Sequence, residues 1–462
     1  MCDYDKLLLR RKSLDIPNVY IEPISDYVYI VEQLDGTGLD ITIVQKFYIY
    51  LDQMIIINNS DEIIKVQDIK DIINQTNFNI WIDAIIERYL TLTPYPERGL
   101  VNPMEECPFI NINNTSFDIK QFGSLIKKVC YNTCEGSDIT ILSSLVNLEE
   151  IKFDDAFNQN IDFLQNFHKI KKIQFGDSFN QPITSLSHLT NLEQLTFNYS
   201  TFNYSIQPLS NLRKLTKLHL GHDFNCSIEP LANLTRLREL TFGRFFDQPL
   251  DSLANLRNLE ILFFGDNFNQ SVDVLSKLSR LKEVSFGYNF NEPIDSFSTL
   301  IDLEKITFGE EFNQPIDSLS NLINLEEINF GFNFNQLVES LANLINLKIL
   351  NFRSLFNRPI ESLSNLTNLT EITFGYYFNQ SINSLDRLVN LEILFFGDNF
   401  NQSVDVLSKL SRLKEVSFGY NFNEPIDCLS SLINLKRLKL KKTFNLSIEP
   451  LANLRNLEII IN

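Results

Sequence analysis

The sequence has few of the side chains on which enzymes most often depend. It contains 4 histidines, 6 cysteines, 3 methionines and 1 tryptophan in 462 residues. His219 and His222 form an H-x-x-H pair without a third ligand, and Cys130 and Cys134 lack the second pair of a zinc site. Residues 36–38 (Gly-Thr-Gly) lack the third Gly and the Lys of a phosphate loop. The sequence therefore predicts a non-enzymatic protein with no metal and no cofactor.

Disulfide frameworks, long apolar runs and excess positive charge are also missing. The cysteines are scattered, and the first residues are polar, so we expect a reduced, cytoplasmic protein without a secretory signal. No segment approaches the roughly 20 apolar residues of a membrane span. Its 40 basic and 58 acidic residues give a net charge of −18, which argues against nucleic acid or anionic membrane as the main partner.

A phenylalanine followed by asparagine recurs through the last two thirds of the chain. The step between pairs is 22 residues, except that the step from Phe179 to Phe202 is one residue longer. Phe246-Asp247 fills one place in the series. The fourteen pairs begin at Phe157, Phe179, Phe202, Phe224, Phe246, Phe268, Phe290, Phe312, Phe334, Phe356, Phe378, Phe400, Phe422 and Phe444. A fixed period of this length is typical of proteins built from stacked repeats.

One repeat shows how the apolar residues are spaced. Leu319, Leu322 and Leu325 occur at every third position, which predicts a tight helical or 3₁₀ turn with these side chains on one side. Ile328 and Phe330 alternate with polar neighbours, which predicts a short strand with one buried face. A single repeat could bury almost none of these groups. Stacked repeats bury them all, and each side chain then contributes roughly 1.5–3 kcal/mol before entropy is counted.

The residue after the strand phenylalanine is glycine in ten repeats, as at Gly331, and these are ten of the 15 glycines in the chain. Asp154 and Asn198 hold the same place in two other repeats. Because all three residue types tolerate positive φ, we expect a sharp bend there. The asparagine after the second phenylalanine is expected to form a buried ladder, with its amide bonded to the backbone of adjoining repeats.

These motifs carry a family resemblance. The strand pattern L-x-x-I-x-F-G and the run S-L-S-N-L-T-N-L at residues 362–369 resemble leucine-rich repeats of the 22-residue class. The pattern I-x-P-L-x-N-L at residues 228–234 and 448–454 is similar to bacterial internalin repeats. The string F-N-Q-P-I at residues 179–183 is more similar to the FNIP repeat of social amoebae and of giant DNA viruses of amoebae. The resemblance covers about residues 140–462.

The resemblance implies an α/β fold of the leucine-rich-repeat type. It would be a curved solenoid with a parallel β-sheet on the concave face and short helical or 3₁₀ turns on the return side. We predict that residues 136–462 form this solenoid, with fourteen repeats and a truncated last strand. Residues 1–135 would form a small mixed N-terminal domain that caps the solenoid or docks a partner. Within it, residues 41–57 are expected to be strand-like or buried, and residues 61–90 to be helical.

The solenoid also contains an internal copy. Residues 258–295 recur without change at residues 390–427, an offset of six repeats. A solenoid tolerates such an insertion because each repeat contacts only its neighbours. An enzyme active site would rarely survive it.

Candidate binding residues lie on the strands and just after the bends. Most residues that flank the buried strand positions are polar, but some are apolar and are expected to stand exposed on the concave face. The candidates are Ile261, Phe263, Tyr288, Phe332, Ile349, Tyr376, Ile393, Phe395 and Tyr420. Either they contact a partner, or Phe263 and Phe395 merely pack on neighbouring strand residues. Fifteen strands would give an inner face on the order of 65–70 Å long.

Two functions fit these features. The first is a protein–protein interaction scaffold that binds a partner of unidentified type on the concave face. The second is a substrate adaptor for a ubiquitin-ligase-like host complex, with residues 1–135 making the ligase contact, as in FNIP proteins that carry an F-box. We find no Leu-Pro-led F-box helix in this region. If the protein is viral, the expected location is the host cytoplasm.

The last strand of the solenoid generates a prediction about weak self-association. Residues 459–461 are three isoleucines in line, and we expect an open sheet edge there, which invites pairing with another chain. Changing Ile459→Lys and Ile461→Lys should lower the amount of any oligomer measured by light scattering. A monomeric native chain at high concentration, or equal association of the Lys variant, would contradict the idea.

Overall fold

The computed structural model describes residues 139–462 and six short strands that precede them. These strands are β1 (Val19–Pro23), β2 (Val28–Gln33), β3 (Gln45–Tyr50), β4 (Ile56–Asn58), β5 (Ile110–Ile112) and β6 (Lys128–Tyr131). The chain divides into two compact units, Met1–Glu193 and Gln194–Asn462, and each is described by itself.

Strands β1 to β4 form an antiparallel sheet in the first unit. β2 pairs with β1 on one side and β3 on the other, and β3 pairs with β4. Within residues 41–57, which were expected to be strand-like or buried, β3 and β4 confirm strands at residues 45–50 and 56–57, and the other residues of this range lie outside the described ones. The helix expected over residues 61–90 lies outside the described residues.

The repeat register begins earlier than the sequence analysis placed it. β6 pairs in parallel with β7 (Glu150–Phe153), and Val129 lies opposite Ile151 and Tyr131 opposite Phe153, so the partners are one repeat apart. β5 pairs in parallel with β6, and β7 with β8 (Lys172–Phe175). The parallel strands thus extend into residues 1–135, where no such period was expected. The turns η2 (Ile139–Ser144), η3 (Asp162–Asn166) and η4 (Thr184–His188) complete this part of the first unit.

The second unit is a parallel sheet whose neighbouring strands are also neighbours in sequence. The strands are β9 (Gln194–Phe197), β10 (Lys217–His219), β11 (Glu239–Thr241), β12 (Ile261–Phe263), β13 (Glu283–Ser285), β14 (Lys305–Thr307), β15 (Glu327–Asn329), β16 (Ile349–Asn351), β17 (Glu371–Thr373), β18 (Ile393–Phe395), β19 (Glu415–Ser417), β20 (Arg437–Leu440) and β21 (Glu458–Ile461).

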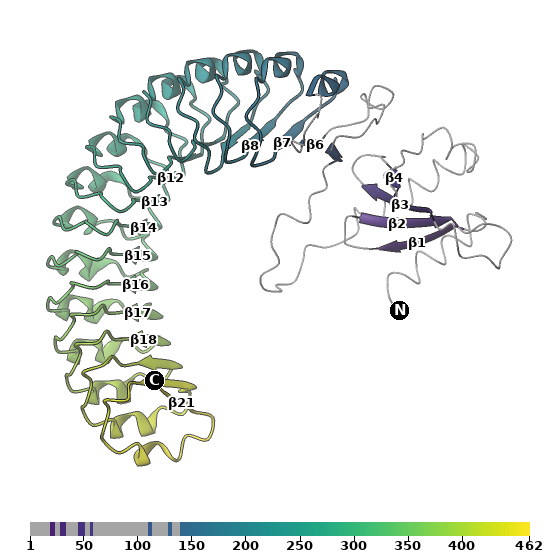
Figure 1. The fold of residues 1–462 in the computed structure, drawn as a ribbon. Coiled ribbons are helices and arrows are strands. Elements are labelled where there is room, and N and C mark those ends of the chain that lie inside the picture. Colours follow the sequence, from purple (N-terminus) through teal and green to yellow (C-terminus); the bar gives the residue numbers. More distant parts are fainter. Residues whose placement is uncertain are drawn as a thin grey trace, which may run out of the picture. The chain divides into compact units, whose positions relative to one another are not determined.

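A short 3₁₀ turn lies between each strand and the next. These turns are η5 (Gln207–Asn211), η6 (Glu229–Asn233), η7 (Asp251–Asn255), η8 (Asp273–Lys277), η9 (Asp295–Thr299), η10 (Asp317–Leu319), η11 (Glu339–Asn343), η12 (Glu361–Asn365), η13 (Asn383–Arg387), η14 (Asp405–Lys409), η15 (Asp427–Ser431) and η16 (Glu449–Leu451). Within this unit the strands lie on the inner side of a curve and the turns on the outer side (Figure 1). We call one strand with its bend and turn a coil.

Leucines at every third position produce the turns, as the sequence predicts. Leu319, Leu322 and Leu325 are fully buried. The backbone N–H of Leu322 donates to Leu319 O (2.9 Å), and that of Leu325 donates to Leu322 O (3.0 Å). This i to i+3 bonding is the 3₁₀ pattern, which brings side chains three residues apart onto one side. Each turn therefore presents its leucines to the core.

Two phenylalanine rings from each typical coil form the rest of the core. Phe330 and Phe334 of one coil stack at 3.8 Å between ring centroids. Phe334 stacks on Phe356 of the next coil at 6.1 Å, and Phe330 on Phe352 at 5.3 Å. The rings thus form two parallel columns. Because an aromatic side chain buries roughly 150–250 Å², these columns are a large part of the apolar core.

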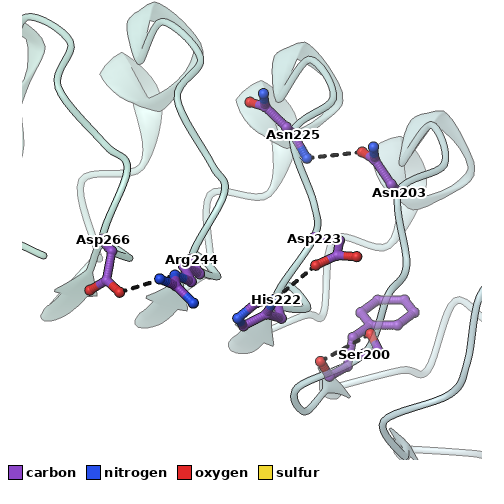
Figure 2. Close-up of polar contacts among 8 residues, drawn as sticks. Ser200, Asn203, His222, Asp223, Asn225, Arg244 and Asp266 are labelled. Atoms are coloured by element: carbon purple, nitrogen blue, oxygen red, sulfur yellow. Dashed lines mark hydrogen bonds and ion pairs between the residues drawn. The ribbon is translucent and has the colours of Figure 1, made fainter. Parts of the chain in front are cut away.

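The coil that is one residue longer than the others accommodates its extra residue in the bend. Phe197 and Phe202 still stack, at 4.3 Å. Ser200 lies between them in sequence, is fully buried, and donates its hydroxyl to Phe197 O at 3.2 Å (Figure 2). The insertion therefore leaves the ring stack of this coil intact.

The asparagines after the second phenylalanine form the expected ladder. In most rungs the side-chain oxygen of one coil accepts from the backbone N–H of the next, as from Asn225 N to Asn203 Oδ1 at 3.0 Å (Figure 2) and from Asn335 N to Asn313 Oδ1 at 2.9 Å. The exception is Asn180, whose Oδ1 has no hydrogen-bond partner where the longer coil follows. Asp247 takes the same part in its coil. The prediction of a buried ladder was wrong, because most of these side chains lie at the surface. The side-chain oxygen still accepts a hydrogen bond from a backbone N–H of the next coil, which satisfies that donor.

The bend glycines have a different cause from the one expected. None of the ten has a φ in the left-handed region. A Cβ on Gly331 would instead lie 1.8 Å from the carbonyl oxygen of Gly309 in the preceding coil. Real Cβ atoms do not approach an oxygen so closely, so glycine is required because neighbouring backbones touch.

We predict that Gly331→Val lowers the free energy of unfolding by about 1–3 kcal/mol, because the new side chain overpacks the contact between coils. Gly331→Ala should also destabilise the chain, since one Cβ is enough to reach Gly309. Leu337→Val, at an exposed position nearby, is the matched control and should change little. Urea unfolding followed by circular dichroism measures all three variants. A midpoint for Gly331→Val equal to that of the control would contradict the close contact.

Candidate protein-binding face

Each strand of the second unit presents two side chains away from the core. The middle residue of β12, Leu262, is fully buried, whereas Ile261 and Phe263 on either side are half-buried. We call these outward residues the sheet face. From β10 to β20 the first outward residues are Lys217, Glu239, Ile261, Glu283, Lys305, Glu327, Ile349, Glu371, Ile393, Glu415 and Arg437. They vary between coils, whereas the core positions hardly do.

The apolar candidates on the sheet face are half-buried, which corrects the expectation that they stand exposed. This holds for Ile261, Phe263, Ile349, Ile393 and Phe395. The physical reason is the parallel register, which places a face residue of each neighbouring strand beside every one of them. Packing on strand neighbours therefore covers part of each side chain, and the remainder stays accessible.

The aromatic candidates beyond the bends are exposed, as expected. Tyr288, Phe332, Tyr376 and Tyr420 are 46–59% exposed. They recur in every second coil, at the end of the sheet where the strands finish.

Acidic residues in the intervening coils hold two of these bends. The Phe332 backbone N–H donates to the Glu310 carboxylate at 2.9 Å, and the Tyr420 N–H donates to Asp398 Oδ1 at 3.1 Å. The backbone that carries the rings of Phe332 and Tyr420 is therefore hydrogen-bonded to the preceding coil.

Ion pairs between neighbouring coils neutralise most charges of the sheet face. Lys217 pairs with Glu239 at 2.6 Å, and Lys305 lies 3.7 Å from Glu283 and 3.3 Å from Glu327. All these side chains are 26–39% exposed. Such pairs contribute little stability each, roughly 0–1 kcal/mol, but they fix which charges remain available to a partner.

Glu415 is the most buried charge of the described chain, with 5% of its surface exposed. Arg437 and Lys439 both donate to its carboxylate. Burial alone would raise the pKa of Glu415, but the hydrogen bonds from Lys439 and Arg437 outweigh it and lower that pKa below its ordinary value. The Lys439 ammonium also lies 5.5 Å from the ring centre of Phe395, within reach of a cation–π attraction.

The duplicated block places the same residues in two surroundings. Glu283 and Glu415 are equivalent positions of the two copies, yet Glu283 remains half-buried and, among the described residues, forms an ion pair with Lys305 alone. The difference comes from the following coil, which supplies Lys305 and Thr307 in one case and Arg437 and Lys439 in the other. Identical sequence therefore yields different faces.

The sequence analysis missed an exposed apolar row at the opposite end of the strands. Ile301, Ile323 and Ile345 occupy the same place in three successive coils and are 53–57% exposed. Asparagines beside them bond between coils, as from Asn346 Nδ2 to Ile323 O at 2.9 Å. The available signal was an apolar residue, also present as Val389 and Ile433, at a place where other coils carry Thr, Ser or Arg.

The histidines and other potential ligands do not gather. His219 ends β10, and burial, followed by the nearby Lys217, lowers its pKa. His222 lies in the next bend and contacts Asp223 at 2.8 Å (Figure 2). Among the described residues no group of three or more His, Cys, Asp or Glu side chains could hold a metal ion. No helix in that same part of the chain is long and apolar enough to cross a membrane.

Comparison with solved structures identifies the fold. A leucine-rich-repeat protein of Leptospira interrogans matches with a TM-score of 0.61 and 16% identity, over 74% of this chain and 91% of the other. A circular leucine-rich-repeat protein, CroV588, matches with a TM-score of 0.54 and 27% identity, over 73% and 53%. The plant peptide hormone receptor RGFR1, solved in complex with RGF2, matches with a TM-score of 0.55 and 16% identity, over 72% and 56%.

No protein-family model and no curated protein matches the chain. The fold expectation is nevertheless confirmed: the chain is a leucine-rich-repeat solenoid in which fifteen parallel strands, β7 to β21, alternate with 3₁₀ turns.

The buried glutamate generates a prediction with an internal control. Glu415→Gln should lower the free energy of unfolding by about 1–3 kcal/mol, because it removes charge-assisted hydrogen bonds from a buried site. Glu283→Gln, the same change in the other copy of the block, should stay within about 0.5 kcal/mol. Urea unfolding at neutral pH measures both. Equal effects would show that burial of Glu415 has no energetic consequence.

The pH dependence follows from the same site. The folded-state pKa of Glu415 lies below its ordinary value of 4.5, so the charged carboxylate stabilises the folded chain above that pH. This stabilisation is lost as the pH falls through the folded-state pKa. The difference in unfolding midpoint between wild type and Glu415→Gln should therefore shrink in acid, and a constant difference from neutral pH to pH 3 would contradict the assignment.

Proposed function

We propose that this protein is a non-enzymatic scaffold that binds a partner protein on the sheet face and the adjoining aromatic residues of the second unit. The observation that carries the proposal is the contrast between a uniform core and a variable face. The leucine and phenylalanine positions are nearly constant from coil to coil, whereas the outward strand positions include Ile, Phe, Glu, Lys and Asn. Packing alone does not require this variation.

The composition of the face supports a protein partner. Half-buried Ile393 and Phe395 and exposed Tyr376 and Tyr420 offer apolar and aromatic surface beside charged residues. Interfaces are enriched in such aromatic anchors with a polar rim. The RGFR1–RGF2 structure is a case in which a protein of this fold is solved with a bound partner.

Three finer proposals accompany this one. The repeats are of the FNIP type and point to a giant virus or a social amoeba, on the sequence resemblance alone. The protein acts in the cytoplasm, which would be the host cytoplasm for a virus. The adaptor role for residues 1–135 is a separate alternative, and co-purification of ubiquitin-ligase subunits with the full-length chain would support it.

Affinity capture with variants tests the scaffold. Full-length protein, tagged and expressed in the native cell, is compared with a double variant, Tyr376→Ala with Tyr420→Ala. Loss of two aromatic anchors should reduce recovery of the bound partner by about tenfold or more. The matched control is Ile323→Ala with Ile345→Ala, which removes exposed apolar groups at the opposite end of the strands.

The control variant should recover the partner as the wild type does. If the control pair loses the partner and the tyrosine pair keeps it, the binding face lies at the other end of the strands and the proposal is wrong. Circular dichroism on all proteins confirms that none has unfolded.

A further inference from the structure

One carboxylate on the sheet face differs from its equivalents. Between β10 and β20 the first outward residue is a glutamate at five places, and Glu239, Glu283, Glu327 and Glu415 each have a Lys or Arg nitrogen within 4 Å. Glu371 on β17 has no ion pair and no side-chain hydrogen bond within the described part of the chain. Its charge is therefore available to another molecule.

The surroundings of Glu371 explain why no cation of the described residues pairs with it. The register places Ile349 of β16 on one side and Ile393 of β18 on the other. Both isoleucines are half-buried, and so is Glu371. The carboxylate thus lies between two aliphatic side chains, which lower the local dielectric and strengthen its attraction to an arriving charge.

A row of two amides, Asn329 and Asn351, at the second outward positions of β15 and β16 ends beside this carboxylate. Asn329 Nδ2 donates to Glu327 Oε1 at 2.6 Å, which leaves Asn329 Oδ1 to accept from Asn351 Nδ2 at 2.8 Å. The orientation of both amides is therefore set by Glu327, which can only accept. Asn351 Oδ1 is left buried and without a hydrogen-bond partner.

A buried acceptor without a partner is unfavourable, so a donor that reached Asn351 Oδ1 would form a favourable hydrogen bond. Asn351 lies opposite Thr373 and one strand away from Glu371. The face side chains around it are only half-buried, and surface side chains change rotamer within nanoseconds. A change of rotamer in a covering side chain would therefore let one entering group reach both open acceptors, the charged Glu371 carboxylate and the neutral Asn351 Oδ1.

The chain shows elsewhere which group suits this position. Lys217 lies opposite Glu239 in the register that Ile349 has with Glu371, and it fills that site with an ammonium at 2.6 Å. The neighbouring strands carry the same outward residues in both places. Glu239 is followed by Ile261 and Phe263 on the next strand, and Glu371 is followed by Ile393 and Phe395 on the next strand. The first of these two sites is occupied by the chain, and the second is open.

We propose that the open site formed by Ile349, Asn351, Glu371, Ile393 and Phe395 receives an arginine side chain from an extended segment of the partner. The proposal rests on the scaffold function above and specifies its partner chemistry. The guanidinium donates to the Glu371 carboxylate and to Asn351 Oδ1, and its aliphatic stem packs on the isoleucines. The ring of Phe395, which also lies 5.5 Å from the Lys439 ammonium, borders the site.

Arginine fits these groups better than lysine. A guanidinium has five N–H donors in a planar fork, so it can bond a carboxylate and an amide oxygen at once and lie flat on an aromatic ring. It is also less strongly hydrated than an ammonium, so it enters a half-buried apolar site more readily. The net charge of −18 attracts basic segments in general, and Glu371 gives one of them a defined position.

The experiment uses the full-length chain and pools of fluorescein-labelled octapeptides. Each pool has seven randomised positions and one position fixed as arginine or as citrulline, its neutral isostere. Fluorescence polarisation gives the affinity of each pool, and the ratio of the two is the arginine preference. We expect the wild type to prefer the arginine pool by about fivefold, as one charge-assisted contact would give.

Two variants should abolish the preference by different routes. Glu371→Gln removes the charge. Ile349→Lys places a cation opposite Glu371, as Lys217 lies opposite Glu239, so the chain's own ammonium occupies the site. The matched control is Glu239→Gln, which alters the net charge by the same amount but changes a site that is already paired. It should keep the wild-type preference, and urea midpoints show that all variants are folded.

The outcomes separate this inference from the scaffold function. Equal arginine preference in wild type and Glu371→Gln overturns the inference, as does a wild type without that preference. If both pools bind equally and Ile393→Asp abolishes that binding, the sheet face still binds peptides and only the arginine site is wrong. The capture experiment with the tyrosine variants tests the scaffold function independently of the pools.

Discussion

The stacking of phenylalanine rings between coils is the contact on which the rest of the structure depends. Phe330 stacks on Phe334 within its coil, and each ring then stacks on its equivalent in the next coil. The glycine bend lets the backbones approach closely enough for this, and the asparagine ladder satisfies the backbone donors beside it. A coil with these three features can be stacked on any other, which is why an identical block could be copied six coils along the chain.

A uniform core restricts variation to the outward positions. The same block gives a half-buried Glu283 in one place and a buried Glu415 in the other, because the following coil differs. The properties of the sheet face thus arise from combinations of neighbouring coils rather than from single residues. The open site at Glu371 is such a combination, since both strand neighbours of the carboxylate are isoleucine and no cation of the described residues pairs with it.

Much of the fold could be predicted from the sequence because its signals are local. The spacing of Leu319, Leu322 and Leu325 predicts the turn, and the alternation at Ile328 and Phe330 predicts the strand. The features that were mispredicted depend on residues in the neighbouring repeat. Gly331 was assigned to positive φ because nothing in its own repeat shows the Gly309 carbonyl against it. The half-burial of Phe263 likewise results from its strand neighbours, and β6 was missed because it carries Val129 and Tyr131 without a Phe-Asn pair.

The residues that stabilise the solenoid and those that are free to bind form separate sets. Phe332 and Phe334 allow a comparison of the two sets, because they are the same residue type two positions apart, 48% and 0% exposed. Phe334→Ala should lower the free energy of unfolding by about 3–5 kcal/mol in urea titration, since it opens a cavity in the ring column. Phe332→Ala should change it by no more than about 0.5 kcal/mol. Equal losses for the two variants would show that the stabilising and the exposed residues are not separate sets.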